Sequence, residues 1–315
     1  MPSPESICQP VATNSHLSTD APLRYINPKF MSGMSFRTQS EAENRLTGPD
    51  APWNGAAGAI LPGSRRGLGV YLQHLVGIAY FFGGGFILTL FWPVVRIFSR
   101  RDPTGEIGSR LLQKLFRSYL WLVQNLRLFY LHWPDADAVL QLRGRIIVSN
   151  HPGLMDAVFL VSKLPRVVCV MRSALMRNPC FFGAARMAGF IPNDRGAEMI
   201  RESVQKLHAG FNLLIFPEGT RTKNGVLNPF KAGFALAAVQ SGATVQCLIM
   251  RQSQPYLIQG LNVFEPESAP VAVAIRLGRE FTPEPGESAR LFAARVEAYF
   301  REELANPGPF NKSGG

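Results

Sequence analysis

The sequence has few of the residues that most often reveal a function directly. Only four of its 315 residues are cysteines, and they are scattered without a CxxC pair (Cys8, Cys169, Cys180 and Cys247). This spacing favours reduced thiols facing the cytoplasm over a zinc site or a disulfide framework. A GxSxG motif is also missing, which argues against a serine esterase. We expect no metal site, because the sequence supplies no metal-ligand spacing.

Acidic residues are scarce relative to basic ones. The chain has 22 Asp and Glu against 33 Lys and Arg, a formal net charge of +11. A surplus of this size indicates a polyanionic partner, such as nucleic acid, anionic lipid headgroups or a phosphorylated substrate. The basic residues are scattered and no nucleic-acid recognition motif is present, so we expect no nucleic-acid partner.

Charged residues are absent altogether from residues 67–95. As one helix, this run would reach about 43 Å at about 1.5 Å per residue, whereas a bilayer core is about 30 Å thick. Two interpretations stay open: a tilted single span, or a hairpin that turns at Gly83-Gly84-Gly85. The positive-inside rule does not orient a single span here, but it places both ends of a hairpin on the cytoplasmic face. The reason is that basic residues flank both ends: Arg65, Arg66, Arg96, Arg100 and Arg101.

Composition divides the chain into four parts. Residues 1–66 are rich in Pro, Ser, Gly and Asn, which predicts a disordered polar tail without a signal peptide. We expect membrane-inserted and interfacial helices over residues 67–135, a catalytic domain over 136–306 and a flexible C-terminus over 307–315. Within the second part, Leu111–Trp133 has apolar residues at helical spacing with basic residues between them. This pattern predicts an amphipathic helix that packs on the catalytic domain or lies at the membrane interface.

From Arg143 onward, predicted strands and helices alternate. The expected strands are Ile146–Ser149, Val167–Met171, Phe190–Ile191, Leu213–Phe216, Thr244–Ile249 and Val271–Arg276. The expected helices are Asp156–Ser162, Ser173–Met187, Ala197–Ala209, Ala232–Gln240 and Glu287–Leu304. This alternation predicts an α/β fold, a mainly parallel sheet covered by helices.

The segment Asn150–Asp156 (Asn-His-Pro-Gly-Leu-Met-Asp) connects a predicted strand to a predicted helix, where open α/β sheets usually bind ligands. Pro152 and Gly153 bend the backbone, so the side chains of His151 and Asp156 can turn towards each other. A carboxylate bonded to one imidazole nitrogen raises the basicity of the other, which can then take a proton from a hydroxyl. Taken alone, the pair also fits a turn histidine and a helix-capping aspartate.

Two further polar turns follow predicted strands. In Phe216–Arg221 (Phe-Pro-Glu-Gly-Thr-Arg), Gly219 allows close backbone approach and Arg221 offers a planar fork for a phosphate. Glu218 can accept from a hydroxyl or hold a neighbouring arginine, and a surface turn with an internal ion pair is the alternative. In the other turn, Arg195 precedes a predicted helix, so its guanidinium and the helix N-terminus can hold an anion together.

The order of these motifs resembles one family. Asn150–Asp156, Gly189–Arg195 and Phe216–Arg221, followed by Phe230-Lys231-Ala232-Gly233, resemble the first three motif blocks of the 1-acylglycerol-3-phosphate acyltransferase (lysophospholipid acyltransferase) superfamily. The resemblance covers about Arg143 to Met250. It implies the glycerolipid acyltransferase fold, here joined to an N-terminal membrane-associated helical segment.

The resemblance also implies an activity. A membrane-bound O-acyltransferase would move a fatty acyl chain from acyl-CoA or acyl-carrier protein, its co-substrate, to the hydroxyl of a lyso-lipid such as 1-acylglycerol-3-phosphate. His151 would be the general base and Asp156 would orient it, with no cofactor and no metal. Arg195 would bind the acceptor phosphate, and the other substrate-binding residues would be Asn150, Glu218, Gly219, Thr220 and Arg221. The expected partner is a bilayer with anionic headgroups, with the catalytic domain on its cytoplasmic face (of the inner membrane in a bacterium).

One departure from the family pattern leaves the acceptor open. In family members that act on lysophosphatidic acid, a fourth block places a proline in the strand after the helix that follows Phe216–Arg221, whereas Ala243–Met250 contains none. The acceptor is therefore lysophosphatidic acid, another lysophospholipid, a lyso-aminolipid or a lipid-linked metabolite. A non-catalytic lipid-binding relative is the alternative from another class. The intact His151, Asp156, Glu218 and Arg221 count against it, because a binding protein needs no base.

Overall fold

A computed structural model of the chain describes residues 66–99, 105–222, 226–253 and 269–305. Apart from Arg66, the predicted tail over residues 1–66 lies outside the described residues, as does the predicted flexible C-terminus over 307–315. Cys8, Arg65, Arg100 and Arg101 lie outside them too.

The charge-free run forms a single long helix, α2 (Leu68–Ser99), with Pro93 near its end. Gly83, Gly84 and Gly85 continue this helix, so the hairpin that turns at these glycines is wrong. Among the described residues, Leu68–Val94 is the one helix that is long and apolar enough to cross a membrane. Only 11% of its most apolar 18-residue stretch is buried inside the protein. Its exposed apolar side chains are Leu68, Tyr71, Leu72, Val76, Tyr80, Phe86, Ile87, Leu90, Phe91, Val94 and Ile97.

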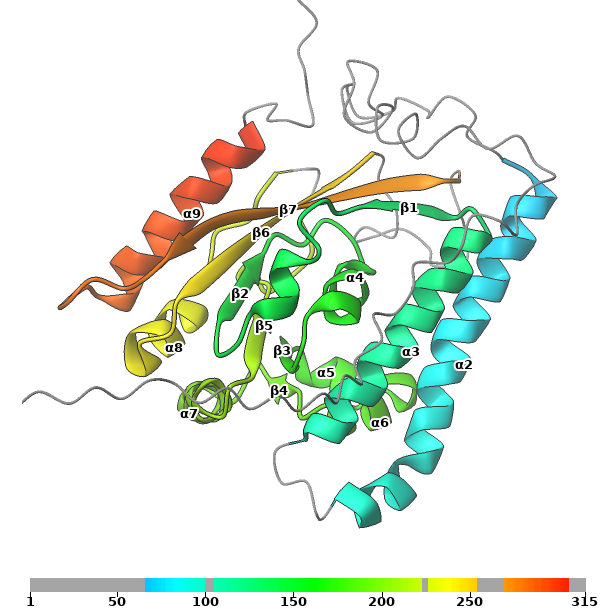
Figure 1. Ribbon diagram of the computed structural model, residues 1–315, viewed down its shortest axis with the longest axis horizontal. Coiled ribbons are helices and arrows are strands. Elements are labelled where there is room, and N and C mark those ends of the chain that lie inside the picture. Colours follow the sequence, from blue (N-terminus) through cyan, green and yellow to red (C-terminus); the bar gives the residue numbers. More distant parts are fainter. Residues whose placement is uncertain (1–65, 100–104, 223–225, 254–268, 306–315) are drawn as a thin grey trace, which may run out of the picture.

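Helix α3 (Glu106–Asn125) lies alongside α2 and buries one face against the rest of the protein (Figure 1). The helix predicted over Leu111–Trp133 therefore begins earlier and ends earlier than expected. Arg127 has a positive φ of 53°, and the chain then enters strand β1 (Phe129–His132). Strand β1 was not predicted from the sequence, because the apolar residues of the strand continue the spacing of the preceding helix.

Seven strands form one sheet in the order β1-β7-β6-β2-β5-β3-β4. All neighbouring pairs are parallel except β6 and β7, which are antiparallel. The mainly parallel α/β fold is therefore confirmed. The remaining strands are β2 (Ile146–Ser149), β3 (Val167–Met171), β4 (Ile191–Pro192), β5 (Asn212–Ile215), β6 (Val245–Gln252) and β7 (Val271–Phe281).

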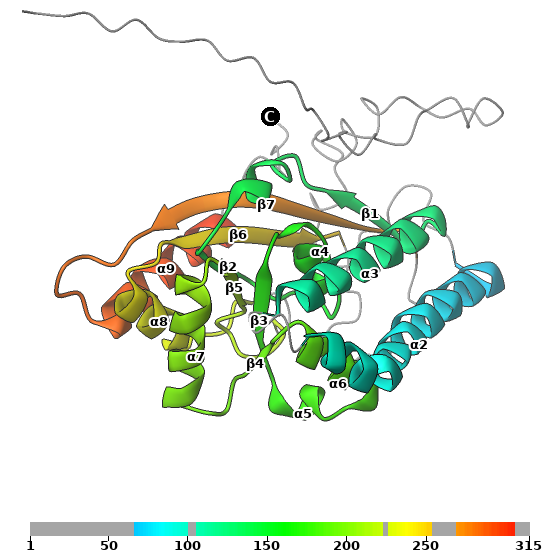
Figure 2. The same ribbon diagram turned by 60° about the horizontal axis from the view of Figure 1, so that its bottom comes forward.

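Helices cover both faces of the sheet (Figures 1 and 2). Alternate residues of β2 show the two sides: Ile147 belongs to one buried core, and Ile146 and Val148 belong to the other. The first core is closed by α2, α3, α4 (Asp156–Lys163) and α6 (Pro179–Met187). The second is closed by α7 (Ala197–His208), α8 (Gly233–Ser241) and α9 (Ala289–Ala305).

One predicted helix is divided in two. Instead of a continuous helix over Ser173–Met187, the structure has α5 (Ser173–Met176) and α6. Asn178 is extended because the following Pro179 disfavours helical backbone before it. Its side chain also accepts a hydrogen bond from the backbone N–H of Cys180 and so caps α6.

Helix α6 attaches the apolar N-terminal helices to the sheet through very close contacts. A Cβ atom on Gly85 of α2 would lie 2.0 Å from the carbonyl oxygen of Cys180. A Cβ atom on Gly108 of α3 would lie 1.8 Å from the carbonyl oxygen of Met187. The N–H of Gly183 donates to Thr89 Oγ1 at 2.8 Å. The missing side chains of these glycines therefore let α2 and α3 approach the α6 backbone.

Candidate functional site

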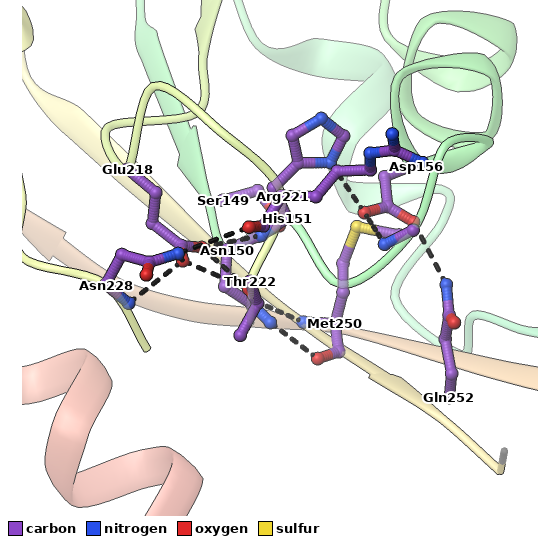
Figure 3. Close-up of polar contacts among 11 residues, drawn as sticks. Ser149, Asn150, His151, Asp156, Glu218, Arg221, Thr222, Asn228, Met250 and Gln252 are labelled. Atoms are coloured by element: carbon purple, nitrogen blue, oxygen red, sulfur yellow. Dashed lines mark hydrogen bonds and ion pairs between the residues drawn. The ribbon is translucent and has the colours of Figure 1, made fainter. Parts of the chain in front are cut away.

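The turn between β2 and α4 brings His151 and Asp156 together. His151 Nδ1 lies 2.8 Å from Asp156 Oδ2, which also accepts from the backbone N–H of Gly153 at 2.7 Å (Figure 3). The His151 side chain is 19% exposed and the Asp156 side chain is fully buried. With Nδ1 engaged by the carboxylate, Nε2 is the ring nitrogen left for a reacting group.

The environment of Asp156 sets its electrostatics. Complete burial raises the pKa of this carboxyl, because the charged form loses its water. Hydrogen bonds from His151, Gly153 and Gln252, together with the charge of His151, act in the opposite direction. The carboxylate thus depends on its protein donors to stay ionised.

Three other contacts hold His151 in place. Its backbone N–H donates to Glu218 Oε1 at 3.0 Å, and its carbonyl accepts from the backbone N–H of Thr222 at 2.7 Å. Its imidazole stacks on the ring of Phe216, with centroids 4.1 Å apart. The third motif therefore supports the first, because both turns lie at the carboxyl ends of the neighbouring strands β2 and β5.

Glu218 is 3% exposed, and protein donors occupy both of its oxygens. Oε1 accepts from His151 N and from Thr222 Oγ1, and Oε2 accepts from the backbone and side-chain nitrogens of Asn228. Asn150, expected in the substrate pocket, is also buried. Its side-chain amide exchanges two hydrogen bonds of 2.8 Å with the backbone of Met250 on β6. In this structure, both residues hold the turn that carries His151.

Positive charge gathers near the dyad. Burial lowers the pKa of Arg221, the nearby charge of Asp156 raises it, and the charge of Arg172 lowers it further. Arg172 Nη2 donates to the carbonyl of Gly219 at 3.2 Å. Gly219 has a φ of +67°, and Lys231 Nζ lies 2.9 Å from where its Cβ would be. Three cations therefore lie around the Gly219 turn.

Arg195 has other partners. Its guanidinium is 40% exposed and pairs with Glu202 at 3.3 Å and Glu198 at 3.7 Å, both on α7. The described contacts do not join Arg195 to the His151–Asp156 pair. Thr220 lies between Gly219 and Arg221 in the same turn.

Several site residues were not singled out from the sequence: Arg172, Phe216, Thr222, Asn228 and Gln252. Arg172 directly follows strand β3 and Gln252 is the last residue of strand β6, so a search for polar residues at the ends of strands would have found them. Asn228 carries no signal of its own, because its partner Glu218 is ten positions away in the chain.

The described cysteines are unpaired, and burial raises the pKa of Cys169 to about 12. Within the described ranges, no three His, Cys, Asp or Glu side chains gather as metal ligands.

The structure is thus an α/β domain whose mainly parallel sheet carries a carboxylate-held histidine at the end of a central strand. Residues 135–251 match the family model described as Acyltransferase. These residues therefore form an acyltransferase domain.

Individual relatives agree with this assignment. The chain is 31% identical over 138 residues to human 1-acyl-sn-glycerol-3-phosphate acyltransferase beta, covering 38% of this chain and 47% of the human protein. It is 28% identical over 194 residues to the 1-acyl-sn-glycerol-3-phosphate acyltransferase of Cocos nucifera, covering 59% and 58%. The chain thus spans about half the length of these relatives.

The fold is also found in a solved structure. The crystal structure of the 1-acyl-sn-glycerophosphate (LPA) acyltransferase from Thermotoga maritima superposes with a TM-score of 0.57. The match covers 75% of this chain and 93% of that one, at 20% sequence identity. At this identity, the likeness supports the fold alone.

Proposed function

We propose that this protein is a membrane-bound O-acyltransferase that moves a fatty acyl chain from an acyl thioester to the hydroxyl of a lyso-lipid phosphate such as 1-acylglycerol-3-phosphate. The observation that carries the proposal is the 2.8 Å contact between His151 Nδ1 and the buried carboxylate of Asp156. The donor is acyl-CoA or acyl-carrier protein, and the chemistry requires neither cofactor nor metal.

In the proposed mechanism, His151 Nε2 takes the proton of the acceptor hydroxyl while Nδ1–H donates to Asp156. The acceptor oxygen attacks the thioester carbonyl carbon, and the carbon–sulfur bond then breaks. The departing thiolate takes the proton from the His151 imidazolium, so an ester and a free thiol leave the site. The acyl chain passes directly between substrates, because the dyad itself contains no nucleophile.

The cations around Gly219 suit a phosphate on the acceptor. Arg221 experiences the charge of Asp156, so a phosphate held there would place the neighbouring hydroxyl near the dyad. Arg172 and Lys231 lie against the same turn and add to the attraction. We assign the main phosphate contacts to Arg172 and Arg221, and a smaller role to Arg195, because two glutamates already occupy Arg195.

The exposed apolar face of α2 supports association with a bilayer. Its exposed Leu, Ile and Phe side chains would enter the acyl-chain region of the bilayer. The basic residues that flank this helix in the sequence would favour anionic headgroups. We place the catalytic domain on the cytoplasmic side, where thioester donors are available.

The test is mass spectrometry of lipids after membranes containing the protein are incubated with acyl-CoA or acyl-carrier protein. A panel of acceptors is needed because β6 lacks the family's proline: lysophosphatidic acid, other lysophospholipids and a lyso-aminolipid. We expect a new diacyl product that disappears in His151→Ala. Full turnover by a normally expressed His151→Ala variant would contradict the mechanism. Lipid binding without product from any acceptor would favour the non-catalytic alternative.

A further inference from the structure

The buried carboxylate of Asp156 accepts a hydrogen bond from a side chain of strand β6. Gln252, the last residue of β6, places its amide Nε2 3.2 Å from Asp156 Oδ1 (Figure 3). The other oxygen, Oδ2, accepts from His151 Nδ1 and from the backbone N–H of Gly153. Gln252 therefore supplies a hydrogen bond to Oδ1, the oxygen opposite the one that faces His151.

This contact matters because Asp156 is completely buried. A buried carboxylate oxygen without a donor carries a large desolvation cost, and the group relieves that cost by taking up a proton. An ionised carboxylate can only accept hydrogen bonds, so the nitrogen of the Gln252 amide must face it. A protonated Asp156 would be a weaker acceptor for His151 Nδ1–H and would no longer stabilise a positive imidazolium.

The position of Gln252 is well determined by its neighbours on β6. Met250 exchanges two backbone hydrogen bonds with the Asn150 side chain, which ties β6 to the start of the catalytic turn. Arg251 Nη2 donates to the carbonyls of Glu303 and Leu304 at the end of α9. The end of β6 is thus held on both sides, and Gln252 is directed towards Asp156 from a fixed strand.

We propose that Gln252 is a positioning residue for the acyl transfer: it anchors Asp156 Oδ1, so that Oδ2 stays ionised and directed at His151 Nδ1. This inference rests on the proposed function. The charged or titratable groups that face Asp156 are His151, by direct contact, and Arg221, by its charge. Gln252 differs from both because it donates without carrying charge, so its removal alters the dyad and leaves the net charge of the site unchanged.

The test begins with Gln252→Met, which keeps the length of the side chain and removes the donor. We expect kcat/KM to fall about 10- to 100-fold, the size expected for losing a hydrogen bond to a charged group. The acid limb of the pH profile should move to higher pH, because Asp156 without the Gln252 donor keeps its proton to higher pH. Gln252→Glu should move it further, because two adjacent carboxylates resist ionising together.

Ser253→Ala is the matched control. Ser253 accepts from the backbone N–H of Ala272 at 3.0 Å, so its loss loosens the same strand end without touching the dyad. We expect the Ser253→Ala profile to match that of the parent. Thermal unfolding of every variant identifies any that fail to fold.

A double-mutant cycle with Asp156→Asn separates positioning from general structural support. If Gln252 acts through the carboxylate, adding Gln252→Met to Asp156→Asn should cost little further activity. An equal loss in both backgrounds, or an unshifted acid limb in a folded Gln252→Met variant, would overturn the inference. Failure of the proposed function is recognised differently: His151→Ala and Asp156→Asn would themselves retain turnover.

Discussion

The imidazole of His151 lies against the ring of Phe216, with centroids 4.1 Å apart and an interplanar angle of 21°. Asp156 restrains the same imidazole at its edge through Nδ1. A ring fixed on one face and on one edge keeps a constant direction for Nε2, the nitrogen that must reach the acceptor hydroxyl. The first and third motifs of the site thus meet through a contact between the turns that follow strands β2 and β5.

Replacing Phe216 with Leu tests this restraint. An aromatic pair contributes about 0.5–1.5 kcal/mol beyond simple burial, so we expect kcat to fall about 3- to 10-fold. The KM of the acceptor should change little, because the phosphate contacts are unaffected. Steady-state kinetics with the Phe216→Leu and Phe216→Tyr variants would check this, and equal losses in both would contradict a stacking role.

Glu218 should prove to be a structural support for His151. In Glu218→Gln, the amide nitrogen would face His151 N or the nitrogens of Asn228, and one buried donor would lose its acceptor. We expect a loss of about 1.5–3 kcal/mol in the free energy of unfolding, together with a fall in kcat. Glu280→Gln is the control, because its exposed pair with Arg145 should contribute only about 0–1 kcal/mol. An unchanged melting temperature in Glu218→Gln would refute this role.

Alanine substitutions of the arginines should differ in how strongly they raise the KM of the acceptor. We expect Arg172→Ala and Arg221→Ala to raise the KM of a phosphate-bearing acceptor about tenfold or more, and that of the acyl donor much less. Arg195→Ala should have a smaller effect, because Glu198 and Glu202 already pair with its guanidinium. Kinetics with the concentrations of both substrates varied would test this. A larger effect of Arg195→Ala would instead assign phosphate binding to Arg195 in the second motif.

Two neighbouring glycines of α2 provide a matched pair of substitutions. Gly85→Ala forces a Cβ to within 2.0 Å of the Cys180 carbonyl oxygen, so overpacking should cost about 1–3 kcal/mol and weaken the attachment of α2 to α6. At Gly83 a Cβ would meet nothing within 4 Å, and Gly83→Ala should gain up to about 1 kcal/mol from helix propensity. Thermal unfolding in detergent should show melting temperatures that move in opposite directions. Equal shifts would mean that α2 does not pack on α6 in this way.

The stability of the protein should depend on pH through Asp156. Burial raises the pKa of Asp156 in the folded protein, so the folded state retains its proton to higher pH than the unfolded chain. Stability from this group is therefore present below the unfolded pKa of about 3.9 and is lost as the pH rises towards the folded pKa. Asp156→Asn cannot ionise and escapes this loss.

We therefore expect the melting temperature of Asp156→Asn to rise relative to that of the parent as the pH rises above about 4, by about 2–4 °C for each kcal/mol. Its activity should nevertheless fall by orders of magnitude, because the tautomer of His151 is no longer controlled. Asp135→Asn, which removes a partly exposed carboxylate, serves as the control. A parent protein that gains stability relative to Asp156→Asn over this range would contradict the burial effect.

The sequence by itself determined the alternation of strands and helices, the parallel sheet and the contact between His151 and Asp156. These features depend on local signals: apolar periodicity, and a Pro-Gly turn between two side chains that are only five positions apart. Strand β1 was missed, and the helix over Ser173–Met187 was predicted whole, because apolar spacing outweighed the backbone signals at Arg127 and Pro179.

Only the tertiary structure decided which elements meet. The carboxyl ends of β2, β3, β5 and β6 converge because parallel strands point the same way. Contacts such as Glu218 with His151 and Gln252 with Asp156 follow from that convergence, across separations of 67 and 96 residues. The continuous helical course of α2 through Gly83–Gly85 was also decided there, because Gly85 gives close access to the backbone of α6, a role that composition cannot distinguish from a turn.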